Sequence, residues 1–200
     1  MRTLGVLVMC LCTLPLNGGA PAPSGGAPGV PVAGREEQVA PAAQPRDHEW
    51  LKALVGEWTT TWRLYMQPDQ PPVESAGTDS VRAVGDYWVV AEARSTMMGV
   101  VFNGIMSLGY DDEREGFHGT WIDSFGGRLW VYRGTLNDAG DTLMLETEGP
   151  SPADPGAIVR YREAMRVTGP DSRTFTSTYE GEHDTWVKLV EVEFQRKKSP

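Results

Sequence analysis

From residue 57 to residue 196 the chain consists of short strand-like segments separated by turn residues, and this pattern constrains the fold more than any other feature. In segment 57–66 the even positions are Trp58, Thr60, Trp62, Leu64 and Met66, whereas most odd positions are polar. Alternation with a period of two is typical of β-strands that bury one face. Similar segments follow at 74–84, 87–96, 100–110, 117–123, 128–136, 141–148, 158–168, 173–179 and 185–196.

About ten strands joined by short turns, with no helical pattern between them, predict an all-β fold. Sequential hairpin connections favour a single antiparallel up-and-down barrel, which leaves no strand edge exposed. A short helix is expected before the first strand, at 47–54. An outer-membrane barrel is disfavoured because segment 158–168 places three arginines on one face and Glu163 on the other.

The N-terminal part of the chain has a different composition from the rest. Residues 1–19 contain a basic residue followed by an apolar run that is too short to span a bilayer, which is typical of a secretory signal peptide. Residues 20–44 are rich in Pro, Ala and Gly and are expected to form a disordered linker. The folded domain is then 45–200, and the protein is expected to be exported, either periplasmic or secreted.

Cysteine usage and charge exclude several functions. Cys10 and Cys12 both lie in the predicted signal, so the mature domain is expected to have no disulfide, thiolate nucleophile or cysteine-based zinc site. The net charge of −9 disfavours nucleic acid and anionic membrane surfaces as partners, and no membrane insertion is expected after signal removal. No two of the three histidines have a metal-ligand spacing, and no metal is expected.

The two ends of the strand-rich region carry a recognisable combination of residues. Gly56 and Trp58 open the first strand after a short helical turn, and Arg196 ends the last strand. This combination is similar to that of lipocalin-like (calycin) barrels, in which the C-terminal arginine lies across the first-strand tryptophan at the closed end. The resemblance implies that Gly56, Trp58 and Arg196 close the barrel, with the Arg196 guanidinium stacked on the Trp58 indole.

Three further motifs identify a family. The segments LGYD (108–111), WIDS (121–124) and VEFQRK (192–197) resemble the bacterial domain-of-unknown-function family 1579, over about residues 49–198. The resemblance implies a lipocalin-like barrel and no particular activity. Some small ten-stranded barrels of similar kind bind haem through a histidine near the C-terminus, and by position His183 is the candidate here. Its Gly-Glu-His-Asp context is typical of a surface turn, so no cofactor is expected.

Candidate catalytic groups are few. Ser124 lacks the glycine pattern of a nucleophile elbow, and the carboxylate pairs Glu146/Glu148 and Glu191/Glu193 are expected on a solvated outer face. Glu92 and Arg94 share one face of an apolar segment, so we expect them to point into the barrel and neutralise each other there. No catalytic residue is assigned from the sequence.

The functional hypothesis depends on which residues are predicted to face the barrel interior. Strand alternation places Trp62, Met106, Trp121 and Tyr161 on the apolar faces of four different strands, and those faces converge in a closed barrel. Together with Glu92 and Arg94, they are the predicted ligand-binding residues. The leading function is non-catalytic binding of a small, largely apolar molecule inside the barrel. The alternatives are an enzyme acting on a small lipid-like or carbonyl substrate in the same cavity, and an envelope interaction module with a solid core.

Overall fold

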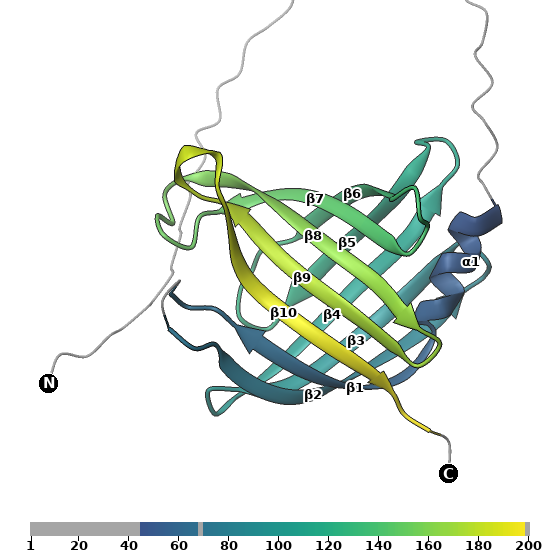
Figure 1. Ribbon diagram of the computed structural model, residues 1–200, viewed down its shortest axis with the longest axis horizontal. Helices are drawn as coiled ribbons and strands as arrows, with labels where there is room; N and C mark the ends of the chain where they lie inside the picture. Colours follow the sequence, from purple (N-terminus) through teal and green to yellow (C-terminus); the bar gives the residue numbers. More distant parts are fainter. Residues whose placement is uncertain (1–44, 68–69, 199–200) are drawn as a thin grey trace, which may run out of the picture. The chain divides into compact units, whose positions relative to one another are not determined.

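The computed structural model describes residues 45–67 and 70–198, and the predicted signal and linker lie outside the described residues. The described residues form one α-helix and ten strands (Figure 1). The elements are α1 (Pro45–Leu54), β1 (Gly56–Leu64), β2 (Val73–Val84), β3 (Trp88–Met97), β4 (Val100–Asp111), β5 (Gly116–Asp123), β6 (Trp130–Leu136), β7 (Thr142–Pro150), β8 (Ile158–Gly169), β9 (Ser172–Glu180), the 3-10 helix η1 (Glu182–Asp184) and β10 (Trp186–Arg196).

The strands close into one antiparallel barrel. Each strand pairs with its neighbours along the chain, and β1 also pairs with β10 to complete the ring. This seam places Trp58 opposite Arg196 and Leu64 opposite Val190. The prediction of an all-β, up-and-down barrel of ten strands with a short N-terminal helix is therefore confirmed. Predicted strand ends differ by up to two residues, as in β6, which was expected from 128 and begins at Trp130 because Leu129 is still in the turn.

Side chains alternate between the barrel interior and the outer face as the sequence predicts. In β8, Tyr161, Glu163 and Met165 are buried, whereas Arg160 and Arg162 are exposed. The alternation therefore places Glu163 in the interior, between two apolar residues of its strand. That placement is the starting point for the functional site.

Helix α1 lies across one end of the barrel and closes it (Figure 1). Its residues Trp50, Leu51 and Leu54 are buried, and the Trp50 ring meets Phe117 edge to face with centroids 5.8 Å apart. The indole Nε1 of Trp58 donates a hydrogen bond to the Leu54 carbonyl at 2.9 Å, which fixes β1 to the end of the helix. Large apolar side chains of the core cluster pack with them, including Val81, Val89, Leu108, Phe117 and Leu143.

Arg196 completes the closed end. Its guanidinium carbon lies 4.1 Å from the centroid of the Trp58 ring, so the expected stacking contact is present. The guanidinium also donates to the carbonyls of Ala53 and Val55, at 3.0 and 2.6 Å, where the last turn of α1 leaves acceptors unpaired. A side chain on Gly56 would collide with this guanidinium, and its φ of +134° also favours glycine.

No helix within residues 45–67 and 70–198 has the length and apolar character needed to cross a membrane.

Candidate functional site

A cavity of about 380 Å³ occupies the barrel interior, in the half away from α1. Its volume lies within the range of roughly 300–1,000 Å³ that is usual for small-molecule sites. The wall is mainly aromatic and methionine side chains: Trp62, Met97, Phe102, Met106, Trp121, Phe125, Trp130, Tyr132, Tyr161, Met165, Phe175 and Phe194. The polar residues in the wall are Arg63, Ser75, Asp79, Asp123, Glu163, Arg173 and Ser177.

One side of the cavity is a cluster of rings around Phe102. The Phe102 ring contacts Trp62 and Phe125 edge to face, with centroids 5.5 and 5.1 Å apart, and stacks on Trp121 at 6.2 Å. The Trp121 indole lies over Gly104, where any side chain would collide with it. Its Nε1 donates to Asp123 at 2.9 Å, so this ring is fixed both by packing and by a hydrogen bond.

A second part of the cavity wall is formed by Trp130 and Tyr161, and Trp130 is the cross-strand partner of Trp121. The Trp130 and Tyr161 rings meet edge to face with centroids 5.1 Å apart, and the Tyr161 hydroxyl donates to the Pro150 carbonyl at 2.5 Å. Gly149 provides space for the Trp130 ring, because a side chain at that position would overlap it. The two aromatic sides are therefore rigid surfaces held by neighbouring backbone.

Glu163 is the polar group that distinguishes this cavity from an ordinary apolar core. Its side chain is buried with a relative exposure of 4%, and its Oε1 accepts a hydrogen bond from the Ser177 hydroxyl at 3.2 Å. Its Oε2 has no hydrogen-bond partner among the described residues. Burial raises the pKa of Glu163 to about 8, because the charged carboxylate loses its hydration and receives only the one hydrogen bond from Ser177 in return.

A buried ion pair separates the cavity from the closed end. The Arg173 guanidinium bonds to Asp79, and both side chains are 5% exposed. Arg173 also stacks on Phe194 at 3.8 Å and on Trp58 at 4.8 Å. Burial raises the pKa of Asp79 and lowers the pKa of Arg173, while their mutual attraction acts against both shifts. The cation at the base of the cavity is thus already paired within the protein.

The structure places four of the predicted ligand-binding residues together. Trp62, Met106, Trp121 and Tyr161 all lie in the wall of the one cavity. Their participation in binding stays a prediction.

The expectation that Glu92 and Arg94 point into the barrel is wrong. They do approach each other, at 3.8 Å, but their side chains are 49% and 71% exposed on the outer face. The inward positions of β3 include Ala91 and Ala93, which leave room for the cavity. Both faces of this strand carry apolar residues, so hydrophobicity alone did not identify the inner face.

Glu163 was missed as a site residue by the sequence reasoning. The signal was available, because period two in segment 158–168 places Glu163 between Tyr161 and Met165 on the inward face. A single acidic residue between two inward apolar residues of a barrel strand is the pattern that would have identified it.

The described residues that line the cavity include no histidine. His118 lies on the outer side of β5, and His183 is exposed in η1. Within the described ranges, no three His, Cys, Asp or Glu side chains come together in a way that could hold a metal ion.

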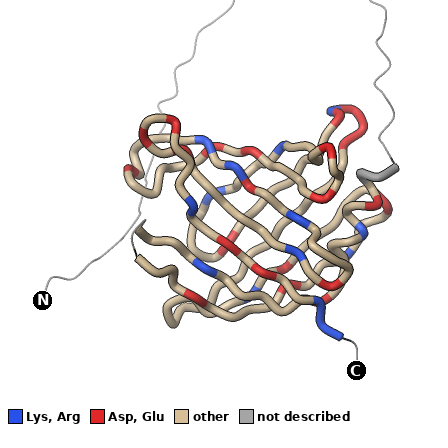
Figure 2. The backbone as a smooth tube through the Cα atoms, in the orientation of Figure 1, with Lys and Arg blue, Asp and Glu red and all other residues tan. Residues whose placement is uncertain are grey.

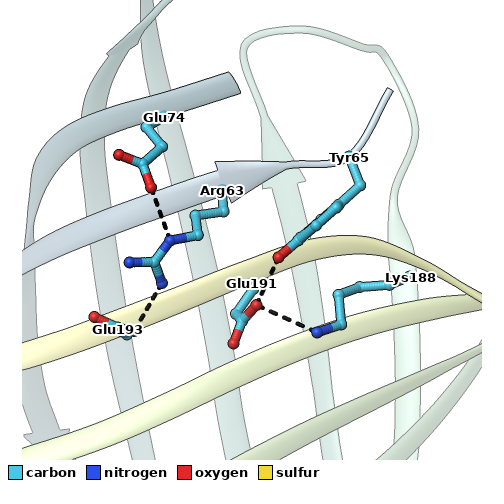
Figure 3. A network of polar contacts seen from close by, with 6 residues as sticks. All are labelled: Arg63, Tyr65, Glu74, Lys188, Glu191 and Glu193. Atoms are coloured by element: carbon cyan, nitrogen blue, oxygen red, sulfur yellow. Dashed lines mark hydrogen bonds and ion pairs between the residues drawn. The ribbon is translucent and has the colours of Figure 1, made fainter. Parts of the chain in front are cut away.

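The main polar network outside the cavity spans the β1–β10 seam on the outer face (Figure 3). Arg63 bonds to Glu74 and Glu193 at 2.9 and 2.7 Å. Tyr65 and Lys188 both donate to Glu191, and these contacts, first that of Tyr65, lower the pKa of the Glu191 carboxyl. Every member of this network has a partner within it. We therefore interpret the network as stabilising the β1–β10 seam and not as a second binding site.

Similar folds occur among solved structures. Rv2717c from M. tuberculosis superposes with a TM-score of 0.56 and 16% identity, over 78% of this chain and 99% of that chain. The S-type phycobiliprotein lyase CpeS from Guillardia theta superposes with a TM-score of 0.53 and 16% identity, over 76% and 93%. At these identities the likeness establishes the fold alone.

The curated proteins contain no match to this sequence. A family profile, in contrast, covers most of the chain. The profile described as "Protein of unknown function (DUF1579)" matches residues 44–196, which include all ten strands. The chain therefore belongs to the DUF1579 family, as its LGYD, WIDS and VEFQRK motifs indicated.

Proposed function

We propose that the barrel binds a small molecule with a largely apolar body, without transforming it. The observation that carries this proposal is the cavity of about 380 Å³ with rigid aromatic sides and one buried carboxyl group whose Oε2 has no partner. An aromatic wall offers a large apolar contact area at low entropic cost, and a single polar group fixes the orientation of a ligand. The reading as an interaction module with a solid core does not account for this cavity.

The similar structures support the proposal only in a general way. One of them is named as a phycobiliprotein lyase. The present chain shares 16% identity with it, so the class of ligand follows from the cavity of this chain and not from the lyase.

A fluorescence titration with the neutral probe N-phenyl-1-naphthylamine tests the proposal. We expect saturable one-to-one binding that quenches tryptophan emission, because Trp62, Trp121 and Trp130 line the cavity. Trp121→Ala should weaken binding by roughly tenfold, which corresponds to about 1.4 kcal/mol of lost aromatic contact. Trp88→Ala is the matched control, because Trp88 lies on the outer face over Gly109. A flat titration of the folded wild-type protein would reject the proposal.

A second candidate function is catalysis by Glu163 on a small lipid-like or carbonyl substrate. A carboxyl group with its pKa raised to about 8 exchanges a proton near neutral pH, which is the property of a general acid or base. The two functions separate when each bound compound is recovered after incubation. Unchanged compound supports binding, whereas a product that forms with wild type and not with Glu163→Gln supports catalysis.

We also propose that the protein is exported before it binds its ligand. The support is the apolar run and the Pro/Ala/Gly-rich segment at the N-terminus. N-terminal sequencing of exported protein should place the mature terminus between Gly19 and Ala27, without lipid. An intact Met1 on the functional protein would overturn this proposal.

A further inference from the structure

We propose that the preferred ligand is a cationic amphiphile, an apolar body bearing one ammonium group that binds at Glu163. This inference rests on the proposed binding function and specifies its ligand class. Three features of the described residues point to a cation: a buried carboxyl group with an unpartnered oxygen, the balance of titratable groups in the cavity wall, to which the aromatic surfaces add, and an acidic mouth.

The first feature is the unsatisfied hydrogen-bonding capacity of Glu163. Ser177 bonds to Oε1, and Oε2 is buried with no partner in the described part of the chain. Arg173, the buried cation in the cavity wall, forms an ion pair with Asp79 and lies between aromatic rings, although its Nε has no partner among the described residues. A carboxylate buried without a counter-ion is costly, and an ammonium group of the ligand would supply both the opposite charge and the missing donor.

The second feature is the balance of titratable groups that line the cavity with Glu163. They are Asp79 on β2, Asp123 on β5, Tyr132 on β6, Tyr161 on β8 and Arg173 on β9, together with Arg63 of β1, whose guanidinium is held by Glu74 and Glu193 on the outer face. Asp79 and Arg173 neutralise each other, so Asp123 and ionised Glu163 leave the cavity with a negative balance. An anionic ligand would meet repulsion from Asp123 and, once Glu163 is ionised, from Glu163 as well.

The aromatic sides of the cavity strengthen the preference for a cation. Tyr132 and Tyr161 line the cavity on the same side as Glu163, and Trp130 packs against Tyr161. Ring faces attract ammonium groups electrostatically, and the attraction grows when water is excluded. A bound ammonium group would therefore be stabilised by rings as well as by the carboxylate.

The third feature is the mouth of the barrel, at the end opposite α1. The turns there lie between β1 and β2, β3 and β4, β5 and β6, β7 and β8, and β9 and β10. Among the described residues of these turns the acidic ones are Asp154, Glu182 and Asp184, and the one Lys or Arg is Arg128 (Figure 2). A mouth of this sign raises the local concentration of cations and slows the entry of anions.

Three ligands with one naphthalene body test the proposal by calorimetry: 2-(1-naphthyl)ethylamine, 2-(1-naphthyl)ethanol and 1-naphthaleneacetic acid. At pH 8 we expect the amine to bind at least tenfold more tightly than the alcohol, and the acid to bind more weakly than either. Below the pKa of about 8 the amine must displace a proton from Glu163. Its affinity should therefore rise by up to roughly tenfold per pH unit between pH 6 and 7, while an alkylammonium group stays protonated up to about pH 10.

The variant Glu163→Gln should remove the preference for the amine and leave the affinity of the alcohol within about threefold, because the shape of the cavity is kept. Glu92→Gln is the matched control, since it removes the same charge from the outer face. If Glu163→Gln does not fold, titrating wild type in two buffers of different ionisation enthalpy still decides the matter, because amine binding at pH 7 must release one proton.

The outcomes separate the two proposals. If the alcohol binds and the amine gains nothing over it, the cationic ligand class is wrong and the binding function stands. An alcohol that binds more tightly at low pH would instead show that protonated Glu163 donates to a neutral acceptor. If none of the three ligands binds to folded protein, the binding function itself fails.

Discussion

The two halves of the barrel interior differ in whether their buried charged groups have a counter-ion within the chain. At the closed end, the Arg196 guanidinium donates to three backbone carbonyls and stacks on Trp58, and the neighbouring Arg173 is paired with Asp79. In the open half, Glu163 is as deeply buried as Arg173, yet Oε2 has no partner among the described residues. Arg173 therefore has a counter-ion within the chain, although its Nε lacks a hydrogen-bond partner among the described residues, whereas Glu163 has neither a counter-ion nor a partner for Oε2.

This contrast distinguishes the closed end, which stabilises the fold, from the open half, which has the features of a ligand site. The closed end is packed with apolar side chains around its paired charges, as expected where stability is the only requirement. The open half combines space with an incomplete polar group, which costs stability in the empty protein. Groups of this kind are expected where a ligand completes the arrangement.

The largest expected effect comes from breaking the buried pair at the boundary. Asp79→Ala leaves Arg173 buried without a counter-ion and should lower the free energy of unfolding by about 3–5 kcal/mol, measured by urea denaturation. Glu92→Ala, which removes one partner of an exposed pair, should change it by less than about 1 kcal/mol. Equal effects at the two positions would show that the boundary pair is not held in a dry environment.

The pH dependence of stability should identify Glu163. Its pKa is raised from 4.5 to about 8 in the folded protein, so its contribution to stability is full below pH 4.5 and is lost as pH rises through about 8. Relative to Glu163→Gln, wild type should therefore lose a few kcal/mol between pH 5 and pH 9, at about 1.36 kcal/mol per pKa unit. Parallel stability curves for the two proteins would show that Glu163 is hydrated in the folded state.

The seam at the closed end should depend on the planar guanidinium of Arg196. Arg196→Ala removes the stack on Trp58 and the bonds to the end of α1, and should cost about 2–3 kcal/mol. Arg196→Lys should recover only part of this loss, because an ammonium group cannot stack or bridge several carbonyls in the same way. Additive effects of Arg196→Ala and Trp58→Phe in a double-mutant cycle would contradict the contact.

The last comparison of stability takes one aromatic residue from each half. Phe117→Ala at the closed end should cost about 3–5 kcal/mol, because the ring is 1% exposed in a filled core. Trp121→Ala should cost less, about 1–2 kcal/mol, because one side of its ring faces the cavity and so less packed space is emptied than at Phe117. Thermal unfolding of the two variants measures this difference, and a larger loss for Trp121→Ala would indicate a filled interior.

Much of the fold could be read from the sequence because its signals are local. Alternation with period two located all ten strands, and the Gly56, Trp58 and Arg196 combination identified the seam. The inner face of β3 was not predictable in this way, because small inward residues such as Ala91 and Ala93 look no more buried than their outward neighbours. Whether side chains fill the interior also depends on how far apart the ten strands lie across the barrel. No single strand encodes that separation.

The binding site was predictable only in part for the same reason. Four wall residues followed from strand parity, whereas the unmatched state of Glu163 depends on the side chains brought around it from β7 and β9. Ser177, which donates to Glu163 Oε1, is 14 positions away along the chain, and Glu163 Oε2 has no hydrogen-bond partner among the described residues. The absence of a hydrogen-bond partner is a property of the assembled interior and cannot be recognised in the sequence.

The most direct test of the central claim, that the open half of the barrel receives a small molecule, is native mass spectrometry with N-phenyl-1-naphthylamine. Wild type should carry one bound probe, and Ala93→Phe, which places a ring in the cavity from β3, should carry none while keeping its fold. Wild type that stays free of probe at saturating concentration, or an Ala93→Phe variant that binds as well as wild type, would contradict the account.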